Sequence, residues 1–424
     1  MDNVYFDLTK EGIVLLKNDN NTLPLSNTDN VSVFGRCQYD LFYVGYGSGN
    51  VNDETRINII DGLNNYNINY NHDLALIYQN YSKKNKVHDG VWGLWPTSHP
   101  ELVLSNDIVS KSKEISNKAV YIIGRCFGED MDEPLTKGGY YLTDTEINNL
   151  KLIEEYYDDY IILINSGNII DLSFLKDFHP KSILYVWFPG SLAGNAIGAI
   201  LKGTDSPSGK MPVTVATSYN DYITSKNFGN KEKTHYYEDI FVGYRYFLTF
   251  AKDKILYPFG YGCSYTNFSI KVKDAKYINN KILISVICKN IGIRCGKDVI
   301  QIYVSSPVNK LSKASKVLVA FKKTKLLKPL DEEIKIINKA TNKEITTEDV
   351  IEYMMQELQN RNVHVKGKTL DLLVKTKNNI YDLEINNVFD EYVRKRNYAY
   401  MSNLYSNLLE HHDSYLDMPK LTQI

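Results

Sequence analysis

Short apolar runs alternate with stretches of helical character between about residue 10 and residue 225, and this alternation constrains the fold more than any other feature. The runs that predict buried strands, each bounded by glycine, proline or asparagine, are residues 31–35, 119–124, 160–165 and 182–188. Strands that alternate with helices are typical of a mostly parallel sheet covered by helices on both faces. The sequence therefore predicts an α/β fold, and its roughly four to six strands are too few for an eight-stranded barrel.

Two helix boundaries in this region carry clear signals. Thr143 and Glu146 form the pattern of a capping box, in which each side chain bonds a backbone N–H of the other residue at the start of a helix. A second helix is expected from Ser191 to about Lys202, and Gly203 is expected to end it.

The pattern changes twice after residue 225. Strand-like alternation predicts a small β-sandwich from the runs 268–272, 281–289, 298–305 and 316–322. Farther along, the sequence predicts a helix capped by Thr346 or Thr347 that runs through Gln359, a hairpin of residues 369–375 and 380–385, and a long polar helix that contains Arg394 and Arg396. We thus expect an α/β sandwich domain (1–225), an aromatic, loop-rich linker packed on it (226–262), a β domain (263–335) and a small α+β tail (336–424).

Composition excludes several classes of protein. The chain has 424 residues, with 49 basic and 50 acidic side chains and a net charge of -1, which argues against nucleic-acid binding and against a polybasic membrane surface. No run approaches the roughly 18 apolar residues of a membrane span, and the N-terminus lacks the pattern of a signal peptide. The five cysteines are scattered, as expected for reduced thiols in a cytoplasmic protein.

Glu129 is the best candidate for a catalytic residue. It follows the apolar run 119–123 in the segment Gly124-Arg-Cys-Phe-Gly-Glu129, and loops at the carboxyl ends of strands are where α/β folds place chemistry. The neighbouring acidic residues Asp130, Asp132 and Glu133 are expected to favour the protonated form that a general acid needs. The alternative is an ordinary solvated acidic loop.

Six stretches together resemble the non-barrel part of glycoside hydrolase family 3, the β-glucosidase family. They are Glu11-Gly-Ile-Val-Leu-Leu-Lys-Asn18 with Leu23-Pro-Leu25, Gly124–Glu129, Gly139-Tyr-Tyr-Leu142, Ser206-Pro-Ser-Gly-Lys-Met-Pro212, Tyr237-Glu-Asp-Ile-Phe-Val-Gly-Tyr-Arg-Tyr246 and Tyr257-Pro-Phe-Gly-Tyr-Gly262. The resemblance implies an α/β sandwich followed by a fibronectin III-like domain, as in a bacterial branch of the family in which the sandwich comes first.

The resemblance also implies a reaction and its residues. Retaining hydrolysis of a β-glucoside or oligosaccharide uses two carboxyl groups about 5–5.5 Å apart and no cofactor. Glu129 would be the general acid/base. Apart from the resemblance, Arg36 and the residues Tyr46, Ser48 and Asn50 follow the first strand in a loop able to approach a ligand, and we expect them to line the sugar site. A plain glycine-rich turn is the alternative.

The three tryptophans are a weaker signal. Trp92, Trp95 and Trp187 have rings that suit stacking on sugars, but packing in a core or an interface is the interpretation that we favour for each.

The family's nucleophilic Asp belongs to a barrel, and no series of βα units follows residue 340. We therefore expect little glucosidase activity from the chain alone, and a barrel domain in trans or a homo-oligomer as its partner. A non-catalytic sugar-binding or structural relic is the alternative.

The tail has a fainter resemblance, to the PD-(D/E)xK nuclease superfamily in its transposase-associated branch. The resemblance implies that Asp371 and Glu384, on the predicted hairpin, hold a divalent metal that activates water. Asn386 departs from the pattern, because Gln or Lys is usual at that position. The alternatives are a metal-dependent nuclease activity or a polar hairpin and helix without a metal.

Overall fold

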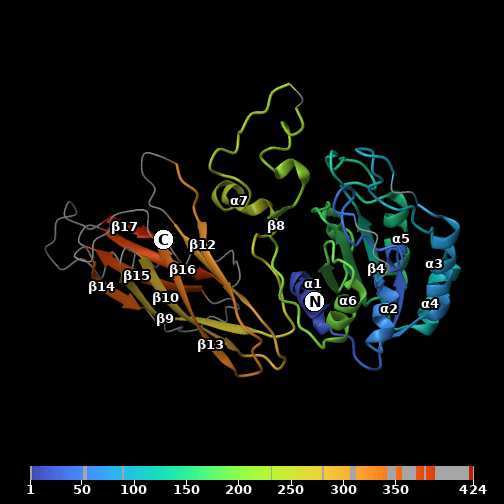
Figure 1. Ribbon diagram of the computed structural model, residues 1–424, viewed down its shortest axis with the longest axis horizontal. Helices are drawn as coiled ribbons and strands as arrows, with labels where there is room; N and C mark the ends of the chain where they lie inside the picture. Colours follow the sequence, from blue (N-terminus) through green and yellow to red (C-terminus); the bar gives the residue numbers. More distant parts are fainter. Residues whose placement is uncertain are drawn as a thin grey trace. The chain divides into compact units, whose positions relative to one another are not determined.

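The computed structural model describes residues 2–50, 55–87, 90–230, 232–278, 281–305, 312–340, 350–355, 369–376, 379–386 and 420–423 (Figure 1). Contacts divide the chain into two compact units. The first comprises Met1–Tyr219 with Gly262–Tyr265, and the second comprises Asn220–Tyr261 with Thr266–Ile424. The domain limits that the sequence predicts stay a prediction beside this division.

The first unit is built around one six-stranded sheet. Its elements are α1 (Asp2–Gly12), β1 (Val14–Asn18), β2 (Asn30–Phe34), α2 (Ile59–Asn65), β3 (Asn69–Tyr70), α3 (His72–Lys84), α4 (Asn106–Ile115), β4 (Lys118–Arg125), α5 (Asp144–Tyr156), β5 (Tyr160–Ser166), β6 (Ser182–Tyr185), α6 (Ala193–Lys202) and β7 (Val215–Ala216). The strand order is β1-β6-β5-β4-β2-β3, and only β1 runs antiparallel to its neighbour. This arrangement confirms the predicted α/β fold with a mostly parallel sheet.

Burial explains why this sheet has helices on both faces. Every residue of β5 and nearly every residue of β4 is buried, so the strands expose neither face to water. Helix α6 packs against both α1 and α2, and α4 packs against α5. In Figure 1, α1 and α6 lie on one side of β4 and α5 lies on the other. The predicted capping box of Thr143 and Glu146 opens α5, and Gly203, at φ +77°, ends α6. Both helix predictions are confirmed.

The topology brings two loops together at one edge of the sheet. Strands β2 and β4 are parallel neighbours, with Val33 opposite Val120. Their carboxyl ends therefore meet at the same edge, and the loops that follow Phe34 and Arg125 lie beside each other. Residue 35 must be glycine for this approach, because a Cβ there would lie 2.5 Å from the carbonyl oxygen of Ile122. This edge carries the candidate site.

The second unit contains two sheets whose strands pair antiparallel, except that β17 runs parallel to β16. Its elements are α7 (Tyr244–Phe250), β8 (Ile255–Tyr257), β9 (Phe268–Ile278), β10 (Lys281–Asn290), β11 (Val299–Val304), β12 (Val317–Lys323), β13 (Glu332–Ala340), β14 (Val350–Met355), β15 (Thr369–Thr376), β16 (Asn379–Asn386) and β17 (Lys420–Gln423). One sheet has the order β13-β10-β9, and the other has the order β12-β11-β16-β15-β14, with β17 beside β16. Residues of β9, β10 and β11 share one apolar core, as expected for a β-sandwich.

The tail departs from its prediction in one place. Val350–Met355 is a strand paired with β15, so the helix expected from Thr346 to Gln359 is wrong in this part, and its remaining residues lie outside the described ones. Valine, isoleucine and tyrosine favour strands, and pairing with a neighbouring strand settles the choice. The predicted hairpin is confirmed as β15 and β16. The polar helix with Arg394 and Arg396 falls outside the described residues.

Two further observations concern location and cysteine chemistry. Among the residues that the structure describes, no helix has the length and apolar character needed to cross a membrane. All five cysteines are free thiols. The predicted cytoplasmic location stays a prediction.

Candidate active site

Glu129 lies on the loop that follows β4, and its side chain is exposed. The loop that follows β2 reaches the same carboxylate. The backbone N–H of Ser48 donates to Glu129 Oε2 at 2.9 Å, and the Ser48 hydroxyl donates to Oε1 at 2.7 Å. Both carboxylate oxygens are thus oriented by a residue 81 positions away in the sequence. The structure brings two of the predicted site residues into direct contact.

Two glycines permit this close approach of the loops. Gly47 has φ +98°, and a Cβ at this position would lie 2.7 Å from Glu129 Oε2. A Cβ at Gly128 would lie 2.6 Å from the Cβ of Tyr46 and 2.7 Å from the ring of Trp95. The N–H of Tyr46 donates to the carbonyl of Phe127 at 3.0 Å. Any larger residue at either glycine would push the loops apart.

Two tryptophans donate hydrogen bonds to the Glu129 loop, one to its backbone and one to a side chain. Trp95 Nε1 donates to the carbonyl oxygen of Glu129 at 2.8 Å, and its ring stacks on Tyr46 with centroids 5.4 Å apart and planes inclined by 12°. Trp92 Nε1 donates to the carboxylate of Asp130. Trp95 therefore packs as expected. Trp92 is 58% exposed, so it is not in the core, and packing of this ring in an interface stays a prediction.

The electrostatics of Glu129 differ from the prediction. The two hydrogen bonds from Ser48 stabilise the charged carboxylate and lower the pKa of Glu129, and they outweigh the opposing charge of Asp130. Asp130 does favour the protonated form, as expected, but the Ser48 bonds are stronger, so the pKa of Glu129 is lowered overall in the chain without bound sugar. Burial also raises the pKa of Glu133, to about 7, so this carboxyl ionises less readily than one on the surface.

Sequence reasoning missed the role of Arg125, the last residue of β4. Its side chain is fully buried and makes a bidentate ion pair with Glu146, with both N–O distances 2.7 Å. The guanidinium also donates to the carbonyls of Gly139 and Tyr141. Arg125 thus joins the stretch Gly124–Glu129 to the stretch that begins at Gly139. Its position inside the first of these stretches was the only sequence feature that could have drawn attention to it.

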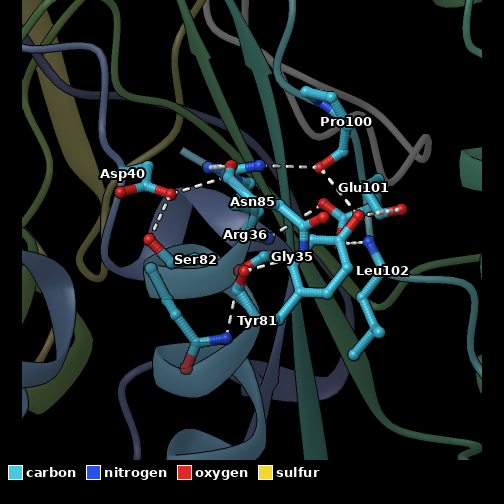
Figure 2. Close-up of polar contacts among 10 residues, drawn as sticks. Gly35, Arg36, Asp40, Tyr81, Ser82, Asn85, Pro100, Glu101 and Leu102 are labelled. Atoms are coloured by element: carbon cyan, nitrogen blue, oxygen red, sulfur yellow. Dashed lines mark hydrogen bonds and ion pairs between the residues drawn. The ribbon is translucent and has the colours of Figure 1, made fainter. Parts of the chain in front are cut away.

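Arg36 belongs to a buried polar network at the same edge of the sheet (Figure 2). Its guanidinium is 2% exposed and donates to Asp40 Oδ2 at 2.6 Å and to the carbonyls of Asn85 and Pro100. Ser82 donates its hydroxyl to the same Asp40 oxygen. These contacts fix Arg36 within the protein, so any contact with sugar would use the small part of the side chain that faces the adjoining cavity.

Glu101 borders this network (Figure 2). Its carboxylate accepts the backbone N–H groups of Arg36 at 2.8 Å and of Leu102 at 2.7 Å. Burial of the carboxyl outweighs these bonds and raises the pKa of Glu101 to about 8. The group therefore keeps its proton at neutral pH.

A cavity of about 480 Å³ adjoins the network, which is a size suited to a small ligand. Its lining combines aromatic and charged side chains: Arg36, Tyr39, Asp40, Leu41, Phe42, Tyr43, Val44, Tyr46, Asn50, Arg56, Ser82, Lys83, Lys86, Val87, His99 and Cys126. Arg36, Tyr46 and Asn50 thus share one cavity, whereas Ser48 contacts Glu129. Tyr46 connects the two features, because its ring also stacks on Trp95.

The predicted metal ligands lie in the second unit. Asp371 and Glu384 are opposite each other in the pairing of β15 with β16. Within the part of the chain that the structure describes, no group of three His, Cys, Asp or Glu residues is placed to hold a metal ion. Metal binding by Asp371 and Glu384 stays a prediction without support.

Comparison with known proteins then decides the family. The family described as "Glycosyl hydrolase family 3 C-terminal domain" matches residues 13–265. The chain belongs to glycoside hydrolase family 3. The match covers nearly all of the six stretches that suggested this family, and that prediction is confirmed.

Relatives in the family support the same assignment. The "Beta-glucosidase" of Ruminococcus albus is 40% identical over 349 residues, which cover 82% of this chain and 36% of that protein. A β-glucosidase structure from Paenibacillus barengoltzii has a TM-score of 0.77 at 40% identity and covers 79% of this chain and 38% of its own. A structure of β-glucosidase 3B from Thermotoga neapolitana in complex with glucose has a TM-score of 0.75 at 30% identity, covering 89% of this chain and 53% of its own.

This chain aligns with less than half of the length of two β-glucosidases, which limits what can be concluded about its function. This family 3 chain spans 36% of the Ruminococcus albus protein and 43% of "Beta-glucosidase A" of Butyrivibrio fibrisolvens. The activity of a whole β-glucosidase therefore comes to this chain only as a proposal.

Proposed function

We propose that this chain supplies the general acid/base, Glu129, for the retaining hydrolysis of β-glucosides. The observation that carries the proposal is the placement of Glu129. Its exposed carboxylate stands on a loop at the carboxyl end of a parallel strand, and Ser48 fixes both of its oxygens. The names of the relatives, which are β-glucosidases, support the choice of substrate class.

The low pKa of Glu129 suits one half of the reaction directly. In the second step of retaining hydrolysis the residue takes a proton from water, which requires the carboxylate that Ser48 stabilises. In the first step it must donate a proton to the leaving oxygen. A sugar bound over Glu129 would exclude water, and loss of hydration raises the pKa of a carboxyl group. Substrate binding thus supplies the change that the acid step needs.

The sugar site is proposed to lie along the Glu129 loop. Ser48 holds the carboxylate and is within reach of a bound hydroxyl. Tyr46, Asn50 and Arg36 line the adjoining cavity, where an aromatic ring and polar groups suit one or two sugar units. The part of Arg36 in this site is limited to its cavity-facing edge, because Asp40 and two carbonyls occupy the rest of the guanidinium.

The attacking carboxylate is proposed to come from another part of the enzyme or from a second chain. Retaining hydrolysis needs a nucleophile about 5–5.5 Å from the acid/base. The chain spans 36% of the Ruminococcus albus β-glucosidase, and the proposal assigns the attacking carboxylate to the part of such an enzyme that this chain does not cover. The chain alone should therefore turn over a chromogenic β-glucoside slowly or not at all. Robust turnover that Glu129→Gln abolishes would disprove the external nucleophile and support Glu129.

The role of Glu129 has its own test. Residues 1–340 are transferred into the Ruminococcus albus β-glucosidase in place of the segment that aligns with them. In this chimera Glu129→Gln should lower kcat by roughly 10²- to 10⁴-fold, the usual contribution of general acid/base catalysis. Azide, which attacks without a general base, should restore turnover of an aryl glucoside with a good leaving group. Asp132→Asn, in an exposed residue of the same loop, is the matched control and should keep full activity.

A non-catalytic sugar-binding function is the second candidate. The cavity beside Tyr46 favours it, because sugar binding there does not require a nucleophile. Calorimetric titration of the chain with glucose tests it. Binding by the chain, together with a chimera that stays inactive with Glu129 intact, would favour this candidate over catalysis.

A further inference from the structure

We propose that the cavity beside Tyr46 binds a sugar that carries a phosphate group, with the phosphate held by the basic side chains Arg56, Lys83 and Lys86. The inference rests on the sugar site proposed above and names the kind of sugar that this site takes. It follows from the charge and the shape of the cavity lining.

The inner wall of the cavity is buried and firmly held. Arg36, Phe42 and Tyr46 all belong to this wall, and all three are buried. Asp40 and two backbone carbonyls fix the Arg36 guanidinium, and the Tyr46 ring stacks on Trp95. A wall held in this way keeps its shape when the cavity is empty, so a ligand can bind without first having to order it.

The charges that line the cavity do not balance. Among the described residues of the lining, Asp40 supplies the one carboxylate, and it is already paired with Arg36 at 2.6 Å. Three further basic side chains belong to the lining, Arg56, Lys83 and Lys86. Four basic side chains against one carboxylate leave an excess of three positive charges, and such an excess attracts an anion.

The two lysines are not neutralised by the protein. Within the part of the chain that the structure describes, neither Lys83 nor Lys86 forms an ion pair, and both are exposed. The helix dipole favours cations in the last turn of α3, which explains Lys83 and Lys84 equally well. Lys86 lies beyond the cap residue Asn85, outside that turn, and it still borders the cavity, whereas Lys84 does not. The position of Lys86 therefore indicates a role toward the cavity.

Arg56 connects the basic side of the cavity to its aromatic side. Its guanidinium lies 5.1 Å from the centroid of the Tyr43 ring, and its Nη2 donates to Asn50 Oδ1 at 3.4 Å. Burial raises the pKa of Tyr43 to about 12, so this ring stays uncharged and does not repel an anion. Arginine and lysine are the side chains that bind phosphate groups in proteins, and here they surround one cavity.

The size and the neighbours of the cavity favour a single phosphorylated sugar. A volume of about 480 Å³ suits a small ligand. The N–H of Tyr46 donates to the carbonyl of Phe127, so the cavity adjoins the loop of Glu129, where the sugar is proposed to bind. A sugar phosphate carries about two negative charges at neutral pH, which suits the basic lining better than a neutral sugar does. A nucleoside phosphate, whose base could stack on the aromatic wall, is the main alternative.

Calorimetric titration of the full chain tests the inference with four probes: glucose 6-phosphate, glucose, inorganic phosphate and AMP. We expect glucose 6-phosphate to bind at least about tenfold more tightly than glucose or inorganic phosphate, because each of these supplies only one half of the ligand. AMP should bind more weakly than glucose 6-phosphate. Salt at about 0.5 M should weaken the binding of glucose 6-phosphate and leave that of glucose unchanged.

Three lysine variants separate a local site from a general effect of charge. Lys83→Met and Lys86→Met should each weaken the binding of glucose 6-phosphate by about threefold or more and leave glucose unaffected. Lys84→Met is the matched control, since it removes the same charge from the same helix end but lies outside the lining, and it should bind like the native chain. Circular dichroism checks that all three variants are folded.

Three outcomes would overturn the inference: equal affinity for glucose 6-phosphate and for glucose or inorganic phosphate, tighter binding of AMP, or the same loss in Lys84→Met as in Lys86→Met. Failure of the acid/base role is a separate result. In that case Glu129→Gln leaves the activity of the chimera unchanged, while the titrations of glucose 6-phosphate keep their outcome.

Discussion

Ser48 donates its backbone N–H and its hydroxyl to the two carboxylate oxygens of Glu129, at 2.9 and 2.7 Å. This pair of bonds orients the carboxylate and favours its charged form. It also makes the chemistry of a residue on one loop depend on the position of a second loop.

Replacing Ser48 should change the protonation of Glu129. Ser48→Ala removes the hydroxyl bond, so the pKa of Glu129 should rise toward its ordinary value, and a ¹³C titration of the Glu129 carboxyl measures this change. Ser48→Thr keeps a hydroxyl and should leave the titration near that of the native chain. An unchanged titration in Ser48→Ala would show that the hydroxyl bond does not control this group.

Gly47→Ala should displace the Glu129 side chain. The new Cβ would lie 2.7 Å from Glu129 Oε2, and the backbone at φ +98° is strained for alanine. We expect a loss of about 1–2 kcal/mol in the free energy of unfolding and a rise in the pKa of Glu129 as the Ser48 bonds break. Gly49→Ala is the control. Gly49 lies in the same loop, but a Cβ added there meets no other atom within 4 Å, so this variant should change neither the free energy of unfolding nor the pKa of Glu129. Equal behaviour of the two variants would contradict this prediction.

Arg125→Met should destabilise the first unit strongly. The substitution leaves Glu146 buried without its partner and frees the carbonyls of Gly139 and Tyr141. Breaking a buried ion pair in this way costs about 3–5 kcal/mol, measurable by urea denaturation. Lys137→Met breaks the exposed pair with Asp144 and should cost about 1 kcal/mol or less. Similar losses in both variants would argue against a structural role for Arg125.

Glu101 should make stability depend on pH. Its pKa is about 8 in the folded chain and near the ordinary 4.5 when unfolded, so the folded state binds more protons between these values. The free energy of unfolding should therefore fall as pH rises from about 4.5 to about 8, by at most roughly 1.4 kcal/mol per pH unit from this group. Glu101→Gln cannot titrate, and its stability curve should be flatter over this range. If the free energy of unfolding depends on pH in the same way in the native chain and in Glu101→Gln, then Glu101 is not the group responsible.

Local patterns predicted a large part of the fold. The strands β2, β4, β5 and β6 and the start of α5 follow from apolar periodicity and from the Thr143–Glu146 capping signal, which act within a few residues. The helix predicted through Gln359 was wrong over Val350–Met355, because pairing with β15 is a long-range contact that periodicity does not report. The role of Arg125 was missed for the same reason, since its partner Glu146 is 21 residues away.

The sequence by itself determined the family, the alternation of strands and helices in the first unit, and Glu129 as the candidate acid/base. Only the tertiary structure decided what surrounds that residue. Ser48 and Glu129 are 81 residues apart, and they meet because β2 and β4 are parallel neighbours whose carboxyl ends share an edge. The direction in which the pKa of Glu129 shifts is set by its contact with Ser48. The two direct hydrogen bonds lower the pKa, and they outweigh the charge of the acidic residue beside Glu129, which acts through water.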